Sequence, residues 1–269
     1  MGIDIVNHDP DIAVNFIQGY YPNVKNVLRL DGIYFNTSQD WKEQNRPIFE
    51  SYKSADSVIV QSRFNKNLVT RYFGDRENIH VIHNGTDSKS IEKIEPAEIG
   101  VCKDNAWLCA SSWRPHKRLA DNIRYFQQHS SQEDILLVAG SGDLSAIEES
   151  KDDRVKYVGD LSWKQLISLM KASCKFIHLA FLDHCPNVVV DARASGCSVV
   201  CSSSGGTMEI AGKNATVVKD LSWDFSPIRL YDPPPLDFET IVENKQEAII
   251  DIERVAEKYN VVFKEAQWA

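Results

Sequence analysis

Two aspartates bracket the start of a short helix, and their spacing can hold an anion between two groups that bind hydroxyls. Asp183 precedes a helix expected from about Asn187, and Asp191 lies one turn inside it, with seven residues between the two aspartates. The backbone N–H groups of a first helical turn carry about half a positive charge, so an anionic group would be held there. The pattern predicts a site for a sugar joined to a phosphate. Two solvated carboxylates on an ordinary buried unit are the alternative.

A basic loop supplies a second group of candidate residues. A strand is expected from residue 106, and the loop after it contains Arg114, Lys117 and Arg118, followed by an amphipathic helix. An arginine fork and a lysine point charge can both meet phosphate oxygens. The loop therefore predicts a diphosphate clamp, for which a solvated basic turn is the alternative.

Polar residues also follow two strands expected near the N-terminus. A strand over residues 3–7 ends at His8, and a strand over residues 24–30 ends at Arg29 and Asp31. In open α/β sheets ligands gather beyond the carboxyl ends of the strands, so these side chains are candidates for a cleft. Surface turns explain His8 and Asp31 as well.

The elements that position these residues read as an α/β chain. Apolar runs over residues 176–182 and 198–201 indicate buried strands on either side of the helix near Asn187, and Gly196 is placed to end that helix. Helical spacing of apolar residues predicts a helix over residues 12–20 and a long amphipathic helix over residues 238–259. Residues 88–103 are polar and charged and contain a proline, which indicates a linker between two domains.

These motifs together resemble the retaining glycosyltransferases of the GT-B fold, in glycosyltransferase family 4. Members of that family carry two glutamates with seven residues between them, where this chain has Asp183 and Asp191. The resemblance also rests on the residues that follow, Ala192, Gly196, Gly205, Gly206 and Glu209, and on the phrases VIVQS and VIHNGTD at residues 58–62 and 81–87. It covers most of the chain and implies two Rossmann-like domains that face a cleft.

The resemblance implies roles for the candidate residues. Asp183 would orient the donor sugar, with Asp31 and His8 on its other face as further catalytic residues, and Asp191 would hold the ribose. The diphosphate would be bound by Lys117 and Arg114, with Arg118 as a substitute, and by the amides of Asn187 and Val188. Tyr157, Val158 and Asp160 are candidates for contacts with the base. No metal or other cofactor is expected, because the lysine, the arginine and the helix N-terminus replace a metal's charge.

The resemblance also predicts the division of the chain. We expect a reduced N-terminal domain over residues 1–87, the linker over 88–103, a nucleotide-sugar-binding domain over 104–235, and a C-terminal helix over 236–269 that crosses back to the N-terminal domain. The N-terminal domain is about half the size usual for the family. Either this minimal domain suffices for a small acceptor, or a homodimer or another partner completes the cleft.

Composition limits the class of protein. The net charge of −8 and the lack of a long basic run argue against a nucleic-acid partner. The chain has no apolar run that would span a bilayer and no signal pattern, so we expect a cytoplasmic protein. The six cysteines lack metal-site spacing and are expected to be reduced thiols.

The sequence favours one function over two others. The first is transfer of a sugar, a hexose by preference, from a UDP- or GDP-type donor to the hydroxyl of a glycan or other acceptor. The shortening of both glutamates to aspartate and the reduced N-terminal domain also suit a scaffold or regulatory subunit that binds a nucleotide sugar without turnover. A nucleotide-sugar hydrolase or epimerase of the same architecture is the third.

Overall fold

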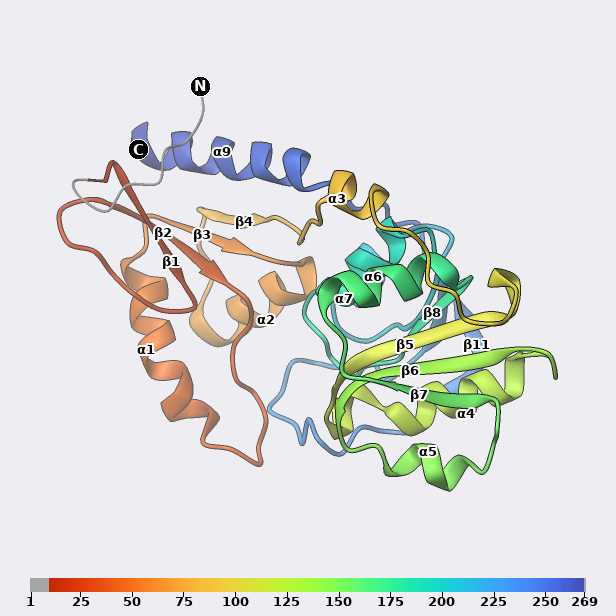
Figure 1. Ribbon diagram of the computed structural model, residues 1–269. Helices are drawn as coiled ribbons and strands as arrows, with labels where there is room; N and C mark the ends of the chain where they lie inside the picture. Colours follow the sequence, from red (N-terminus) through yellow and green to blue (C-terminus); the bar gives the residue numbers. More distant parts are fainter. Residues whose placement is uncertain (1–9, 269) are drawn as a thin grey trace.

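The computed structural model describes residues 10–268, so the strand expected over residues 3–7 and the candidate His8 lie outside it. Within this range the chain forms two α/β units, each built on its own sheet (Figure 1). The first sheet has the order β1-β2-β3-β4, and all its neighbouring strands are parallel. Its strands are β1 Ile12–Phe16, β2 Lys25–Leu30, β3 Ser57–Val60 and β4 Ile79–Val81.

Helices cover both faces of the first sheet. Helices α1 (Trp41–Ser54) and α2 (Arg63–Phe73) pack on one face, and the last helix, α9 (Ile252–Trp268), lies across the other (Figure 1). Val255 and Val262 of α9 enter a buried cluster with Val27 of β2. The C-terminal helix therefore closes the core of the N-terminal unit.

The helix predicted over residues 12–20 is wrong, because residues 12–16 form strand β1. The apolar spacing of Ile12, Phe16 and Ile17 suits a helix, but parallel pairing with β2 decides the outcome, with Ile12 opposite Lys25. The strand expected over residues 24–30 is confirmed as β2.

The second sheet has the order β11-β10-β9-β8-β5-β6-β7 and is parallel except where β11 joins β10. Helix α4 covers one face, and α6 and α7 cover the other. The strands are β5 Ala106–Trp113, β6 Ile135–Gly142, β7 Val155–Gly159, β8 Lys175–His178, β9 Ser198–Ser202, β10 Thr216–Lys219 and β11 Asp237–Val242. The helices are α3 Ser88–Glu92, α4 Leu119–His129, α5 Ser145–Ser150, α6 Trp163–Ala172, α7 Asn187–Ala194 and α8 Thr207–Ile210, with 3₁₀ turns at Lys103–Asn105 and Pro115–Lys117.

The segment after β10 departs from the expected arrangement. Residues 237–242 form β11 on the edge of the second sheet, and α9 begins only at Ile252, so the long helix predicted over 238–259 is wrong in its first half. Before β11, the side chains of Trp223, Phe225 and Ile228 pack against the core of the N-terminal unit. This segment thus leaves the second unit, contacts the first and returns.

The segment between the two units is more than a polar linker. It contains helix α3, and Ile91 and Ile94 are buried in the core of the second unit beneath α6 and α7. The strands β5 and β8 and the helix α7 expected from the sequence are present. The carboxyl ends of β5 and β8 and the start of α7 meet at one edge of the second sheet, where ligands gather in such folds.

Candidate active site

A cavity of about 320 Å³ lies at this edge of the second sheet. It is lined by Ala110, Ser111, Ser112, Arg114, Lys117, Ala139, Gly140, Asp160, Leu161, Leu166, His178, Asp183, Pro186, Asn187 and Val188. Loops after β5, β7 and β8 and the first turn of α7 supply most of this lining. Every lining residue belongs to the second unit.

Lys117 and Asp183 form an ion pair in the cavity wall. Lys117 Nζ lies 2.5 Å from Asp183 Oδ2, and each side chain is 13% exposed. His178, the last residue of β8, places its Nε2 2.9 Å from the same oxygen. Within residues 10–268 no hydrogen bond reaches Asp183 Oδ1, so this oxygen can accept one from a ligand hydroxyl.

These contacts set the protonation of the group. Burial opposes ionisation of Asp183, but the hydrogen bond from His178 and the charge of Lys117 outweigh it and hold the pKa of Asp183 well below its usual range. Burial lowers the pKa of His178, although Asp183 favours its charged form. At neutral pH the aspartate is therefore a carboxylate, and a neutral His178 donates its Nε2–H to it.

The loop that carries Lys117 is held by neighbouring backbone contacts. Lys117 lies in the 3₁₀ turn Pro115–Lys117, whose His116 carbonyl accepts a hydrogen bond from Phe181 N at 2.7 Å. Asn122 of α4 donates from Nδ2 to the carbonyl of Lys117 at 3.1 Å. These contacts tie the basic loop to the segment that leads to Asp183.

The cavity is also lined, near the first turn of α7, by three more residues predicted to bind the diphosphate and by one predicted to contact the base. Arg114 is exposed at the rim, and Asn187 and Val188 are the first residues of α7. Pro186 at the N-cap provides no side-chain cap, so no side chain within the described part of the chain satisfies the first amides of the helix. Asp160 lines the same cavity from the loop after β7.

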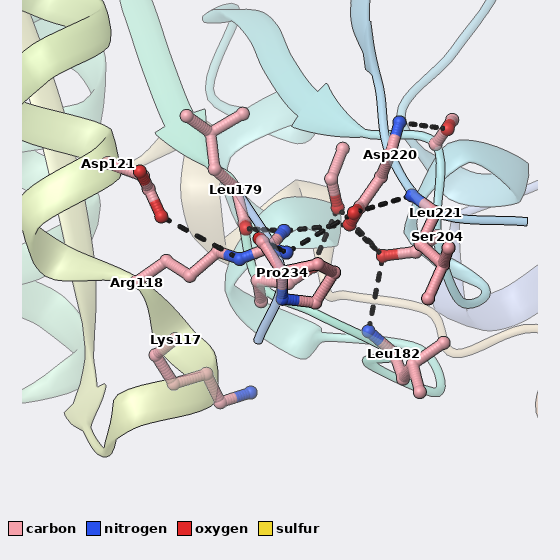
Figure 2. A network of polar contacts seen from close by, with 12 residues as sticks. Lys117, Arg118, Asp121, Leu179, Leu182, Ser204, Asp220, Leu221 and Pro234 are labelled. Atoms are coloured by element: carbon pink, nitrogen blue, oxygen red, sulfur yellow. Dashed lines mark hydrogen bonds and ion pairs between the residues drawn. The ribbon is translucent and has the colours of Figure 1, made fainter. Parts of the chain in front are cut away.

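The prediction that Arg118 can bind the diphosphate is wrong, because its side chain does not reach the cavity. The side chain is 1% exposed, and its guanidinium pairs with Asp220, with Nη1 to Oδ2 at 2.7 Å. Figure 2 shows Lys117 and Arg118 pointing in different directions, with Arg118 inside a network that Lys117 does not join. Adjacent basic residues here have different surroundings, which the sequence could not separate.

Asp191 does not line the cavity either. It is buried in α7, and its Oδ2 accepts a hydrogen bond from Trp163 Nε1 at 3.0 Å. Burial raises the pKa of Asp191, although the side chains of Thr86 and Trp163 favour its ionised form. In this arrangement the carboxylate is engaged by protein groups.

The other two residues predicted to contact the base, Tyr157 and Val158, do not line the cavity. Tyr157 is 46% exposed and donates a hydrogen bond to the carbonyl of Gly140, a residue of the cavity wall, at 3.0 Å. Val158 lines a separate groove between α6 and residues 93–97. Only Asp160 of this predicted group contacts the cavity directly.

Asp31 lies at the end of β2, outside the cavity lining. Its Oδ1 lies 2.6 Å from both Arg29 Nη1 and Gln61 Nε2. Arg29 continues toward the second unit, because its Nη2 donates to Asn84 Oδ1 and Asn84 Nδ2 donates to Asn187 Oδ1 at 2.7 Å. Asp31 is thus linked to the start of α7 through side chains of both units.

Sequence reasoning missed two histidines beside Asp183. His178 was hidden inside an apolar strand, where its only signal was a titratable residue within the run 176–182. His184 packs between the units, with its ring 5.6 Å from that of Phe64, and burial lowers its pKa to about 4. Neither residue follows from the spacing of the two aspartates.

The described part of the chain lacks both a metal cluster and a membrane-spanning helix. Between residues 10 and 268, no three His, Cys, Asp or Glu side chains come close enough to form a metal site. None of the helices in the described range has the length and apolar character needed to cross a membrane.

The part of the chain that holds the cavity resembles a known family. Residues 91–224 match the family model described as glycosyl transferases group 1. An uncharacterized glycosyltransferase of Methanocaldococcus jannaschii is 24% identical over 185 residues, which cover 64% of this chain and 47% of that protein. The part of the chain that holds the cavity is therefore similar to the group 1 glycosyltransferases. The chain spans about half the length of the curated relative that it matches.

Solved structures place most of the chain in a known fold. The structure of Anabaena HepE in complex with UDP-glucose aligns with a TM-score of 0.57 and 21% identity, over 69% of this chain and 55% of that one. The sucrose-phosphate synthase of Thermosynechococcus elongatus aligns with a TM-score of 0.65 and 16% identity, over 90% of this chain and 68% of that one. The two units have the GT-B arrangement of these glycosyltransferases.

Proposed function

We propose that this chain, whose residues 91–224 match the family model of the group 1 glycosyltransferases, transfers a sugar from a nucleotide-diphosphate donor to an acceptor hydroxyl with retention of anomeric configuration and without a metal. The observation that carries the proposal is the Lys117–Asp183 pair in the wall of the cavity. A lysine charge there can meet a diphosphate, while the free Oδ1 of Asp183 can accept a hydrogen bond from a sugar hydroxyl.

The charges in the cavity suit a departing diphosphate. Lys117, Arg114 and the uncapped amides of Asn187 and Val188 surround the same space. Fixed positive groups aimed at developing negative charge usually contribute more to such catalysis than any other effect. In the proposed step the bond from the anomeric carbon to the diphosphate breaks as a bond to the acceptor oxygen forms on the same face. The departing phosphate oxygen takes the acceptor proton.

The donor is proposed to be a UDP-sugar, with a hexose as the sugar. HepE, which shares the fold, has been solved with UDP-glucose and with UDP. In the proposed pose the base lies toward Asp160 in the cavity wall. The ribose would lie toward Asp191, whose carboxylate is outside the cavity lining and accepts a hydrogen bond from Trp163. As the resemblance implies, Asp31 and His8 are proposed to line the other face of the donor sugar, although His8 lies outside the described residues. We propose the cytoplasm as the location, where nucleotide sugars are available.

A thermal-shift panel with UDP, GDP, ADP and CDP, each with and without EDTA, tests the proposal. A ligand at a hundred times its Kd stabilises a protein by about 2.7 kcal/mol. UDP is expected to raise the Tm equally with and without EDTA, and turnover of UDP-glucose should require an added acceptor. Stabilisation by no diphosphate would contradict the proposal, and loss of the shift in EDTA would contradict metal independence. UDP release without acceptor would indicate a hydrolase.

A further inference from the structure

Arg118 forms a buried network beside the cavity, and its position follows Lys117 directly. Its Nη1 and Nη2 donate to the two carboxylate oxygens of Asp220 at 2.7 and 3.2 Å, and the Asp220 side chain is fully buried. Arg118 Nη2 also donates to the carbonyl of Pro234 at 2.7 Å. A buried ion pair seldom adds net stability compared with apolar residues of the same size, so this one calls for another explanation.

The first branch of the network ends at Lys117. Arg118 has a φ of 55°, in the left-handed region that a residue other than glycine seldom adopts. Its side chain is fixed by Asp220, and its carbonyl accepts a hydrogen bond from Asn122 Nδ2 at 2.6 Å. The contacts of the Arg118 side chain and of its carbonyl therefore hold the backbone directly after Lys117 in one conformation.

The second branch ends at Asp183. Ser204 Oγ donates to Asp220 Oδ2 at 2.5 Å and accepts from Leu182 N at 3.3 Å (Figure 2). Leu182, directly before Asp183, also lies in the left-handed region, with a φ of 54°. Strained backbone of this kind persists only where surrounding contacts over-determine it, and it gathers at functional sites.

The two branches converge on one carboxylate. Asp220 is linked through Arg118 to the residue after Lys117, and through Ser204 and Leu182 to the residue before Asp183. Lys117 and Asp183 are the two residues that pair across the cavity wall at 2.5 Å. The network thus fixes both partners of this pair without contacting the cavity.

From this geometry we infer that Arg118, Ser204 and Asp220 are positioning residues, whose role is to hold Lys117 and Asp183 in register for the diphosphate and sugar of the donor. The inference rests on the proposed function. Small displacements of groups that meet a reacting centre cost large factors in rate, so the network should control kcat more than folding.

Ser204→Ala tests the inference, because it removes one hydroxyl from the relay and leaves the ion pair in place. The matched control is Ser173→Ala, since Ser173 is also buried and donates from Oγ to a carbonyl, that of Leu169 at 2.9 Å, away from the cavity. With UDP-glucose as donor, Ser204→Ala should lower kcat about tenfold with a smaller change in KM, and Ser173→Ala should leave kcat unchanged. Both variants should have similar Tm values.

A double variant separates positioning from general weakening. In the Asp183→Ala background, Ser204→Ala should cause no further fall in kcat, because the group at the end of the Ser204 branch is gone. Equal falls in both backgrounds, or an unchanged kcat in Ser204→Ala alone, would overturn the inference. If Ser204→Ala does not fold, Ser204→Cys replaces it, because the thiol is similar in size and a weaker donor.

A measurement without ligand keeps the inference independent of the donor. The ammonium ¹H–¹⁵N signal of Lys117, identified by its absence in Lys117→Ala, should shift or broaden in Ser204→Ala and not in Ser173→Ala. An unchanged signal in Ser204→Ala would overturn the inference even if UDP-glucose is not turned over. Failure of the wild-type protein to bind UDP, with the signal shifted as expected, would instead count against the proposed function alone.

Discussion

The carboxylate of Glu209 caps a helix of the other unit: its Oε1 accepts a hydrogen bond from the backbone N–H of Phe64, near the start of α2, at 2.8 Å. Its Oε2 accepts from Arg63 N, also at 2.8 Å, and lies 2.9 Å from His83 Nε2. Burial opposes ionisation of Glu209, but these hydrogen bonds outweigh it and lower its pKa. A negative charge at a helix N-terminus is stabilising, so this residue joins the two units.

Glu209→Gln should therefore destabilise the protein by about 1–3 kcal/mol, because it removes a charge and leaves one acceptor in place of two. Urea unfolding at pH 7 measures this loss, with Glu148→Gln on the exposed surface of α5 as the control. The pKa of Glu209 is lower in the folded state, so its contribution is present above the unfolded value and is lost as the pH falls through the folded one. The difference in free energy of unfolding between wild type and Glu209→Gln should therefore decrease on acidification. A difference that does not change with pH would contradict this account.

Gly206, directly before α8, packs closely against His184 of its own unit and against Ser62 of the other unit. A Cβ built at Gly206 would lie 2.0 Å from the carbonyl oxygen of His184 and 2.7 Å from Oγ of Ser62, the N-cap of α2. Gly206→Ala should cost about 1–3 kcal/mol or more, because backbone atoms cannot move aside cheaply. Gly85→Ala should cost less, since the nearest atom there, at 2.9 Å, is a side-chain methyl of Val255.

Small-angle scattering can distinguish separation of the units from a loss of stability alone. If Gly206 permits the interface, Gly206→Ala should have a larger radius of gyration than Gly85→Ala at equal folded fraction. Equal radii and equal unfolding midpoints for the two variants would show that the contact is unimportant.

Lys117→Ala tests the charge that the cavity directs at a diphosphate. Loss of one preorganised group that stabilises developing charge typically costs about 10²–10³ in kcat. We expect a fall of that order with UDP-glucose, together with loss of the UDP-induced rise in Tm. Lys164→Ala, an exposed lysine on α6, is the control and should change neither. A Lys117→Ala enzyme that turns over normally would remove this residue from the mechanism.

The local parts of the fold and the site could be predicted from the sequence. The unit β8–α7–β9 follows from apolar runs, a turn and a terminal glycine, all of which act over a few residues. Lys117 and Asp183 were singled out from charge type and position, and the structure pairs them at 2.5 Å. Such residues sit at element ends, where topology brings them together.

The remainder depends on contacts between distant segments. Residues 12–16 became a strand because β2 offers a parallel neighbour, and residues 237–242 because β10 offers an antiparallel one. Arg118 was misjudged because its partner Asp220 lies 102 residues further along the chain. The sequence shows two adjacent basic residues, and only the fold decides which of them is buried.

The stability of the protein should fall on acidification because of His116, which is buried with its ring centroid 5.3 Å from that of Tyr231. Burial, with the nearby charge of Lys117, lowers the pKa of His116 to about 3. In the unfolded chain His116 is protonated as the pH falls below about 6.5, whereas in the folded protein it stays neutral. Each pH unit below 6.5 therefore lowers the free energy of unfolding by about 1.4 kcal/mol, until the folded pKa is reached. Between pH 7 and pH 5 this amounts to about 2 kcal/mol. Urea unfolding at both pH values measures it. His116→Phe keeps a ring against Tyr231 but cannot titrate, so its free energy of unfolding should fall by less than that of the wild type over the same interval, and the difference should equal the His116 contribution. Equal falls in the two proteins would show that His116 is protonated as readily in the folded protein as in the unfolded chain.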